Sequence, residues 1–366
     1  GRLPAEAPAA VAAPPPPAVL VPGCATTARS FDLAPKASLA RHLASAGVDT
    51  WTMELRGIGS SRRAAGGLAN APPDSPWDFD VHAREDVAAV LRHVARRTGR
   101  EELSGVGHSM GGMLLLATAA AQGGGGPRLG KVVVMASALE APSGHPTYAG
   151  LSRLAQGGVQ RKVAGAVPGL RLPVGAVSAA QSYAIGAASG AARARASGGR
   201  SAGAQQALAG WAEALAGSTS KYGSTSLPLL RRLLRLSFDA VPLSLVLQMT
   251  TVFTPGGLRR ADGVPYMELL GPLREPGGPG VLVVAANVDT VFPLEAVRKT
   301  AAAAGADVAV AGGGGARDYN HFDVLVGRDA PTDVWPSVVD YLTKESGAER
   351  ERQQEAPAAA VGARAE

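Results

Sequence analysis

VGHSMGG, residues 106–112, is the stretch that decides the fold. It indicates a buried strand that turns sharply into a helix, because the glycines on either side of Ser109 carry no Cβ that would block a tight turn. Such a turn, a nucleophile elbow, leaves the serine hydroxyl exposed at its corner. The helix predicted at 112–121 points its N-terminal N–H groups toward the same place, where an oxyanion would form.

Strands and helices alternate along the chain around this elbow. Short apolar runs predict the strands, and apolar residues at helical spacing predict the helices between them. The strands are predicted at 18–21, 48–55, 103–107, 131–136, 281–286 and 307–311, and the helices at 37–46, 81–97, 112–121 and 294–304. This order predicts an α/β fold with a mostly parallel sheet and helices on both faces.

The alternation is interrupted at residues 142–276, where the sequence is rich in Ala, Gly and Leu and shows no convincing strand. We therefore predict an inserted helical cap at 142–276, between two parts of the core at 18–141 and 277–346. The segments 1–17 and 347–366 are of low complexity, and we predict that they are disordered.

Two further residues complete a candidate catalytic set with Ser109. Asp289 follows the strand at 281–286, and His321 lies in the loop after the last strand, so both lie beyond the carboxyl ends of strands. The order serine, acid, histidine is the one expected for an elbow on this kind of sheet. Asp323, two residues after His321, is the alternative acid. Asp289 is preferred because it lies at a strand end of its own.

The backbone N–H groups of Met110 and Cys24 are the predicted oxyanion donors. Met110 follows the candidate nucleophile, and Cys24 opens the loop after the strand at 18–21. The chemistry of Ser109, His321 and an acid needs no metal and no organic cofactor. Cys24 is the only cysteine, which excludes an intramolecular disulfide and a cysteine-rich zinc site. We expect its thiol to be a small buried apolar group rather than a nucleophile.

The formal net charge of +6 is unevenly distributed. Residues 142–280 contain 14 Lys and Arg against 5 Asp and Glu, and the rest of the chain is net negative. Without interleaved aromatic residues or a known motif, this region does not indicate nucleic-acid binding. Leucines at 229–236 alternate with Arg231, Arg232 and Arg235, which gives a helix one apolar and one cationic face. We favour packing of the apolar face onto the core, and contact with a lipid surface is the alternative.

Beyond the elbow, the chain resembles the α/β-hydrolase superfamily in two stretches, LRGIGS at 55–60 and HFDVLVGR at 321–328. The resemblance is to lipase-like and esterase-like members. It is closest to a plant and algal branch whose histidine loop likewise runs into an Ala-Pro and a Val-Trp-Pro segment, here 330–331 and 334–336. The resemblance implies an α/β-hydrolase fold.

This resemblance covers residues 18–140 and 265–345, and the chain departs from the family pattern at two places. Pro22 and Gly23 stand where many members have His-Gly. The sequence before residue 18 is also too short for the first two strands of the usual fold. We therefore expect either a shortened sheet or an incomplete N-terminus.

Together these features predict a serine hydrolase that cleaves a carboxylic ester through an acyl-enzyme intermediate, with an acyl-lipid or another apolar ester as substrate. An acyltransferase with the same residues is one alternative, and a binding protein that keeps the fold without turnover is another. No uninterrupted apolar run is long enough to span a bilayer, so we expect a soluble protein. We expect it to be intracellular, in the plastid or the cytoplasm, and the plastid is implied only by the resemblance to the plant and algal branch. The sequence leaves the oligomeric state open.

Overall fold

The computed structural model describes residues 14–64, 77–122, 126–142, 170–196, 224–313 and 317–344. In these residues the main sheet has six strands in the order β2-β1-β3-β4-β7-β8, and all neighbouring pairs are parallel. The strands are β1 (Ala18–Val21), β2 (Thr50–Thr52), β3 (Glu102–His108), β4 (Arg128–Met135), β7 (Gly280–Ala286) and β8 (Asp307–Ala311). The predicted α/β class with a parallel sheet is confirmed.

The inner strands of the sheet are buried on both faces, as their continuous apolar runs require, whereas most residues of the edge strand β8 are exposed. In β7, Val281, Val283 and Ala285 belong to one hydrophobic cluster, whereas the alternate residues Leu282 and Val284 belong to a second cluster. Successive side chains of a strand point to opposite faces, so each such strand contributes to two cores. Helices must therefore cover both faces.

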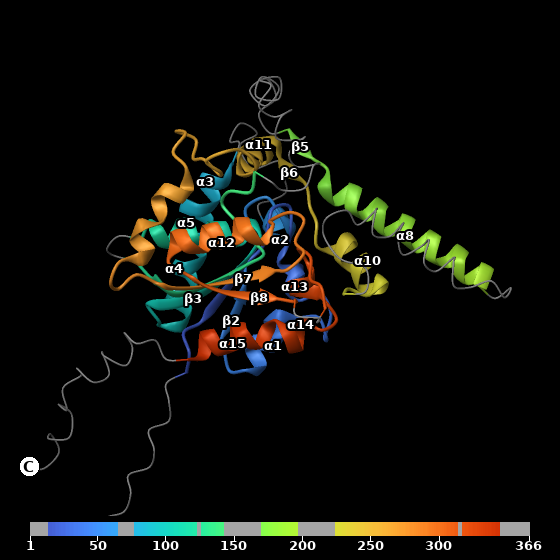
Figure 1. Ribbon diagram of the computed structural model, residues 1–366, viewed down its shortest axis with the longest axis horizontal. Coiled ribbons are helices and arrows are strands. Elements are labelled where there is room, and N and C mark those ends of the chain that lie inside the picture. The colour runs from blue at the N-terminus through green and yellow to red at the C-terminus, as the bar shows by residue number, and fades with distance from the viewer. Residues whose placement is uncertain are drawn as a thin grey trace, which may run out of the picture.

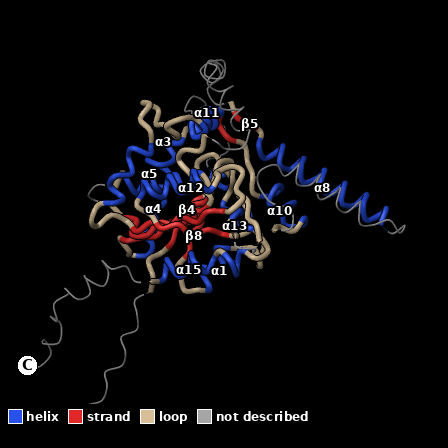
Figure 2. The backbone as a smooth tube through the Cα atoms, viewed as in Figure 1, coloured by secondary structure: helices blue, strands red, loops and turns tan. Residues whose placement is uncertain are grey.

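Helices lie on both sides of the sheet, and Figure 2 shows the strands as a layer between them. One face carries α4 (Ala88–Thr98), α5 (Met110–Ala120) and α12 (Leu294–Ala304), and the other carries α1 (Leu39–Ser45) and α15 (Trp335–Thr343) (Figure 1). Nine of the eleven residues of α5, the helix after the elbow, are buried. A helix that is apolar all round is expected where the sheet and other elements enclose it.

The predicted bounds agree with the structure best for the most strongly patterned segments. The strands predicted at 18–21 and 307–311 and the helix predicted at 294–304 have the predicted bounds. The strand predicted at 48–55 is shorter, because β2 lies at the edge of the sheet and pairs only with β1. The helix predicted at 81–97 consists of three consecutive segments, α3 (Phe79–Val81), the π-helical η2 (His82–Val87) and α4.

The predicted cap contains a strand pair that the sequence did not indicate. β5 (Arg171–Leu172) pairs in antiparallel fashion with β6 (Val241–Pro242). Two residues are too few to show an alternating pattern, so the expectation of a strand-free cap was wrong. The described helices of this interval are α8 (Val174–Ala196), α10 (Leu227–Leu236), α11 (Leu243–Met249) and the 3₁₀-helices η4 (Thr250–Phe253) and η5 (Tyr266–Arg274). Its residues 143–169 and 197–223 lie outside the described part of the chain.

Helices α8 and α10 lie side by side, and α8 extends away from the body of the molecule (Figure 1). Leu230 and Leu234 of α10 pack with Ile185 of α8, and Leu233 joins the core cluster on the α1 face of the sheet. The predicted packing of the apolar face of α10 is therefore confirmed. Its cationic face is left toward the surface.

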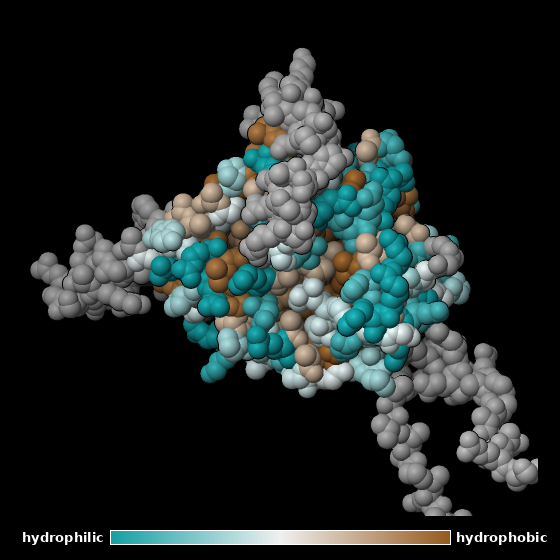
Figure 3. Space-filling view, turned by 180° about the vertical axis from the view of Figure 1, so that it is seen from behind, coloured by the Kyte–Doolittle hydropathy of each residue, from teal (hydrophilic) through white to brown (hydrophobic). Residues whose placement is uncertain are grey.

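Short elements complete the fold: η1 (Ala28–Ser30), α2 (Gly59–Ala64), α13 (Asp323–Val326) and α14 (Ala330–Asp333). None of the helices in the described residues is long and apolar enough to cross a membrane. Seen from the side opposite to Figure 1, hydrophobic and hydrophilic residues are interspersed over the surface (Figure 3).

Of the two low-complexity ends, 1–17 and 347–366, only residues 14–17 are described. Pro16 and Pro17 are buried, and the carbonyl of Pro17 accepts a hydrogen bond of 2.8 Å from the N–H of Ser104, so the start of the chain's described part is fixed to β3. The prediction of disorder for residues 1–13 and 347–366 concerns segments that lie outside the described residues.

Candidate active site

Ser109 lies at the corner between β3 and α5, where the sequence predicts the elbow. Its backbone angles, φ 55° and ψ −126°, are ones that residues other than glycine rarely adopt, and they cost free energy. The N–H of Ser109 donates to the carbonyl of Met135 at 2.9 Å, which helps to hold this conformation. Backbone strain of this kind is concentrated at functional sites.

Close backbone contacts explain the two glycines of the elbow. A Cβ on Gly111 would lie 2.0 Å from the carbonyl oxygen of Val21, and a Cβ on Gly107 would lie 2.4 Å from the backbone of Gly111. Neither position has room for a side chain. A Cβ on Gly23, in the loop after β1, would lie 3.1 Å from the Cβ of Ser109. The loop after β1 therefore passes directly beside Ser109.

Asp289 and His321 are joined by a hydrogen bond of 2.9 Å between Oδ2 and Nδ1, and both residues are buried. The second carboxylate oxygen of Asp289 accepts the N–H groups of Val291 at 2.8 Å and Phe292 at 3.0 Å. These donors fix the orientation of the carboxylate. The contact of Oδ2 with Nδ1 assigns the N–H of the imidazole to Nδ1 and leaves Nε2 as the nitrogen that can accept a proton.

Asp323, the alternative acid, has other partners. Its Oδ1 accepts the hydroxyl of Thr225 at 2.6 Å, and its Oδ2 accepts the N–H of Asn320 at 2.8 Å. Because Thr225 lies just before α10, this carboxylate ties the loop of His321 to the cap. Nδ1 of His321 donates its hydrogen bond to Asp289 and not to Asp323, and the catalytic role of either acid stays a prediction.

His108, the residue before Ser109, is a member of this site that the sequence did not indicate. Its buried ring lies 4.8 Å from the ring of His321, and its Nε2 lies 2.9 Å from the carbonyl oxygen of His321. Burial, together with the charge of His321, lowers the pKa of His108 to about 3. The neutral ring therefore carries its proton on Nε2 and donates it to that carbonyl. His108 fastens the backbone of His321 next to Ser109.

The predicted oxyanion donors lie on two segments next to Ser109. Met110 is the first residue of α5, and Cys24 belongs to the loop after β1. Neither N–H group donates to an acceptor among the described residues. Burial raises the pKa of the half-buried Cys24 thiol to about 12, so the thiol stays protonated. This agrees with the expectation that Cys24 is not a nucleophile.

The loop that carries Cys24 is fixed to the cap by backbone hydrogen bonds. The N–H of Thr27 donates to the carbonyl of Ser237 at 2.9 Å, and the N–H of Asp239 donates to the carbonyl of Ala25 at 2.8 Å. Ala25 itself has a positive φ of 59°. The segment that leads from α10 to β6 thus holds this loop against the corner of Ser109.

Comparisons with known proteins agree with this architecture. The family model described as alpha/beta hydrolase fold matches residues 16–315. The chain belongs to the α/β-hydrolase fold family. Among solved structures it is similar to the monoacylglycerol lipase of Paleococcus ferrophilus, with 16% identity, a TM-score of 0.53 and coverage of 90% of this chain and 96% of that chain. It is also similar to DcsB, solved in complex with its substrate analogue, with 16% identity, a TM-score of 0.51 and coverage of 89% and 90%.

A search of curated proteins found no match. At 16% identity the likeness to these two structures concerns the fold alone. The site of this α/β-hydrolase must therefore be interpreted from its own residues.

Aromatic side chains gather around His321 in this α/β-hydrolase. The rings of Phe292 and Phe322 each lie 5.5 Å from the ring of His321. Phe253 stacks on Phe292 at 6.1 Å, and Phe238 contacts Phe322 edge-on at 5.6 Å. Four of the six phenylalanines of the chain thus form one cluster beside the candidate base. Phe238 and Phe253 come from the cap and are partly exposed, so the cap contributes apolar surface here.

Proposed function

We propose that this α/β-hydrolase cleaves carboxylic esters, with Ser109 as the nucleophile, His321 as the general base and Asp289 as the acid that orients His321. The observation that carries the proposal is the 2.9 Å hydrogen bond between Asp289 and Nδ1 of His321, in a loop that His108 fastens next to the elbow. A serine becomes a nucleophile at neutral pH when an oriented base of this kind accepts its proton.

In the proposed first step, Oγ of Ser109 attacks the acyl carbon and gives its proton to Nε2 of His321. The N–H groups of Met110 and Cys24 stabilise the negative charge that develops on the carbonyl oxygen, and one such donor contributes a factor of about 10² to 10³ to kcat. His321 then protonates the leaving alcohol, and an acyl-serine remains. Water then attacks the acyl carbon while Nε2 of His321 accepts a proton from the water. His321 returns this proton to Oγ of Ser109 as the bond between Oγ and the acyl carbon breaks, which releases the carboxylic acid and restores Ser109.

The proposed substrate class is an acyl-lipid or another apolar ester. The phenylalanine cluster supports it, because the partly exposed Phe253 stacks on Phe292, which lies beside His321. Each methylene of an acyl chain buried on such apolar surface contributes about 0.8 kcal/mol. The Paleococcus ferrophilus protein of similar fold is named a monoacylglycerol lipase, and monoacylglycerol belongs to the same substrate class.

Labelling by a fluorophosphonate probe tests the proposed nucleophile. We expect the purified wild-type chain to be labelled, and Ser109→Ala and His321→Ala to be unlabelled although folded. Absence of labelling in a folded wild-type chain would contradict the hydrolase proposal and favour the alternative of a binding protein without turnover.

An acyl-chain series tests the proposed substrate class. We expect kcat/KM for p-nitrophenyl esters to increase with chain length, and the increase to shrink in Phe253→Ala, which removes apolar surface from the cap. Equal turnover of short and long esters would count against an apolar substrate. Product analysis with an added alcohol distinguishes hydrolysis, which releases the acid, from acyl transfer.

A further inference from the structure

A cavity of about 610 Å³ lies between the cap and the core. Its walls come from the loop at 34–37, from α10, from Ser182 of α8 and from the two residues after α13. Five of its lining residues are cationic, namely Lys36, Arg231, Arg232, Arg235 and Arg328, and none of the described lining residues is acidic. None of the candidate catalytic residues lines this cavity.

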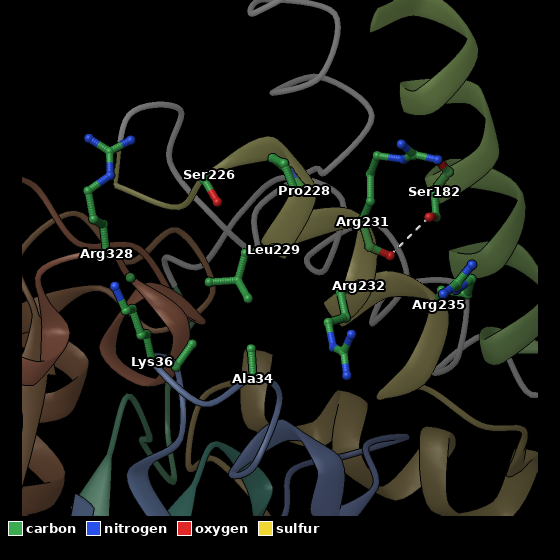
Figure 4. A pocket seen from close by; sticks show the side chains of 12 residues that line it. Ala34, Lys36, Ser182, Ser226, Pro228, Leu229, Arg231, Arg232, Arg235 and Arg328 are labelled. Carbon is green, nitrogen blue, oxygen red and sulfur yellow. Dashed lines mark hydrogen bonds between the residues drawn. The ribbon is translucent and has the colours of Figure 1, made fainter. Parts of the chain in front are cut away.

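The cationic side chains come from three separate segments around the cavity, and their charged groups point in different directions (Figure 4). Lys36 extends toward Arg328 on one side, and Arg231 and Arg232 lie on the other side of Leu229. The cavity is therefore cationic at both sides and has an apolar side chain between them.

Two of the arginines are held in place by backbone carbonyls. Nε of Arg231 donates to the carbonyl of Ser182 at 3.1 Å, and Nε of Arg232 donates to the carbonyl of Leu33 at 2.6 Å. A guanidinium has five N–H donors, so each arginine keeps further donors for a ligand. These contacts orient the side chains without neutralising their charge.

Within the part of the chain that the structure describes, none of the five cations forms an ion pair with a carboxylate. The acid next to Arg328 in the sequence, Asp329, pairs instead with Arg317 at 3.1 Å. Like charges around a concave surface repel each other and produce a strong positive potential inside it. A bound anion would remove this repulsion.

The N-terminus of α10 adds to the positive potential. Ser226, Pro228 and Leu229, at the start of this ten-residue helix, all line the cavity. The positive end of the helix dipole favours an anion at such a position, although Pro228 has no backbone N–H to donate. Ser226 is the N-cap residue, and its side chain makes no capping hydrogen bond, so its hydroxyl is left to donate to a ligand.

We propose that this cavity is a binding site for a phosphate group. One carboxylate would neutralise only one of the five cations, whereas a phosphate monoester carries about −1.5 to −2 charges and three acceptor oxygens that guanidinium groups bind in bidentate fashion. The phosphate group of a lipid and that of a soluble compound have the same chemistry here. The inference does not depend on the proposed hydrolase function.

A bound phosphate would connect the cap to the core. It would touch the loop at 34–37, α10 and Arg328, and the N–H of Arg328 already donates to the carbonyl of Ser224 at 2.7 Å. Because α13 lies between His321 and Arg328 in the sequence, this connection would be made close to the loop of the candidate base. The ligand should therefore stabilise the contact between α10 and α13.

Isothermal titration calorimetry with inorganic phosphate and with pyrophosphate, in chloride buffers of matched ionic strength, tests the site. We expect saturable binding to the full wild-type chain. The double variant Lys36→Gln/Arg328→Gln should bind at least about tenfold more weakly, because it loses charge-assisted hydrogen bonds. The control Arg97→Gln/Arg298→Gln removes the same charge from exposed positions of α4 and α12 and should bind like the wild type.

Absence of saturable binding of soluble phosphate to the wild type, together with absence of binding to vesicles that contain phosphatidic acid, would overturn the proposal. An equal loss in the two double variants would also overturn it, because the attraction would then follow net charge alone. Circular dichroism verifies that each variant folds. Should Lys36→Gln/Arg328→Gln not fold, the single variant Arg235→Gln, at an exposed position of α10, serves the same test and should also bind more weakly.

Vesicles distinguish the two sources of the phosphate. In one outcome, the wild type sediments with phosphatidylcholine vesicles only when these contain phosphatidic acid, and Lys36→Gln/Arg328→Gln does not sediment with them. This outcome would identify a lipid head group as the ligand. Binding of soluble phosphate without binding to vesicles would identify a soluble phosphate compound. Either result supports the phosphate site, whereas vesicle binding that persists in the double variant, without binding of soluble phosphate, overturns it.

Discussion

The corner at Ser109 and the cavity along α10 differ in how their charges are balanced. At the corner, Asp289 is paired with His321 and accepts two backbone N–H groups, and His108 is kept neutral by burial. At the cavity, five cations have no carboxylate partner among the described residues. The first arrangement is preorganised before a ligand arrives, and the second is completed only by an anion. The comparison therefore distinguishes side chains that are already oriented for a reaction, at the corner, from side chains whose charge favours binding of an anion, in the cavity.

Removal of the acid at the corner should have the largest effect. In Asp289→Asn the side chain no longer stabilises an imidazolium or the correct tautomer of His321, so kcat should fall by a factor on the order of 10⁴ while the fold is kept. Asp323→Asn, the same change two residues after His321, should cause a much smaller loss, because Asp323 contacts Thr225 and Asn320 instead. Steady-state kinetics with a p-nitrophenyl ester measures both. A larger loss in Asp323→Asn would reverse the assignment of the acid.

The close packing at the corner predicts the next largest effect. Gly111→Ala places a Cβ 2.0 Å from the carbonyl oxygen of Val21, so either β1 or α5 must move. We expect the free energy of unfolding to fall by about 3 kcal/mol. Gly271→Ala, where a Cβ would meet nothing within 4 Å, is the control and should change it by less than about 1 kcal/mol. Urea denaturation compares the two, and equal stability would show that the corner tolerates a side chain.

His108 makes the stability of the corner depend on pH. Its pKa is about 3 in the folded chain, against about 6.5 for an unperturbed histidine. Between these values the unfolded chain binds a proton that the folded chain does not, so stability is lost as the pH falls below about 6.5. At pH 5 this one group should lower the free energy of unfolding by about 2 kcal/mol.

His108→Gln isolates this effect, because glutamine also offers an N–H donor to the carbonyl of His321 but does not titrate. Urea denaturation at neutral pH and at pH 5 should show a loss of stability on acidification that is about 2 kcal/mol smaller in the variant than in the wild type. The same loss in both proteins would mean that His108 is protonated or exposed in the folded state.

The sheet could be predicted from the sequence because its signals are local. The runs at 18–21 and 307–311 are bounded by turn residues, so their bounds follow from the local pattern. Continuous burial makes the first run apolar throughout, whereas the second lies at the edge of the sheet and is mostly exposed. The pairing of β5 with β6 could not be predicted, because two residues carry no period and their partner lies far away in the sequence. The local pattern therefore predicts the position of a strand only when the strand is long enough for its pattern of apolar residues to be recognised.

The candidate site divides in the same way. The elbow and the chain order of Asp289 and His321 are visible in the sequence, because strand ends of a parallel sheet meet at one edge. The contact of His108 with His321 spans 213 residues and depends on how two loops pack. The cationic face of α10 was also visible, but Lys36 and Arg328 join it only in the folded chain. Convergence of distant loops has no signature in a single sequence.

The smallest predicted effect concerns the cavity, and it tests whether the two regions are independent. Phosphate at ten times its Kd should stabilise the folded chain by about 1.4 kcal/mol, or about 3 °C in Tm, because it binds the folded state alone. Asp289→Asn should be stabilised equally, since the corner contributes nothing to this site, whereas Lys36→Gln/Arg328→Gln should not. Phosphate also stabilises proteins in general by exclusion from their surface. An equal rise in Tm in all three proteins would therefore reflect exclusion of phosphate from the surface. A rise that requires Lys36 and Arg328 would instead show that phosphate binds in the cavity and balances its positive charge.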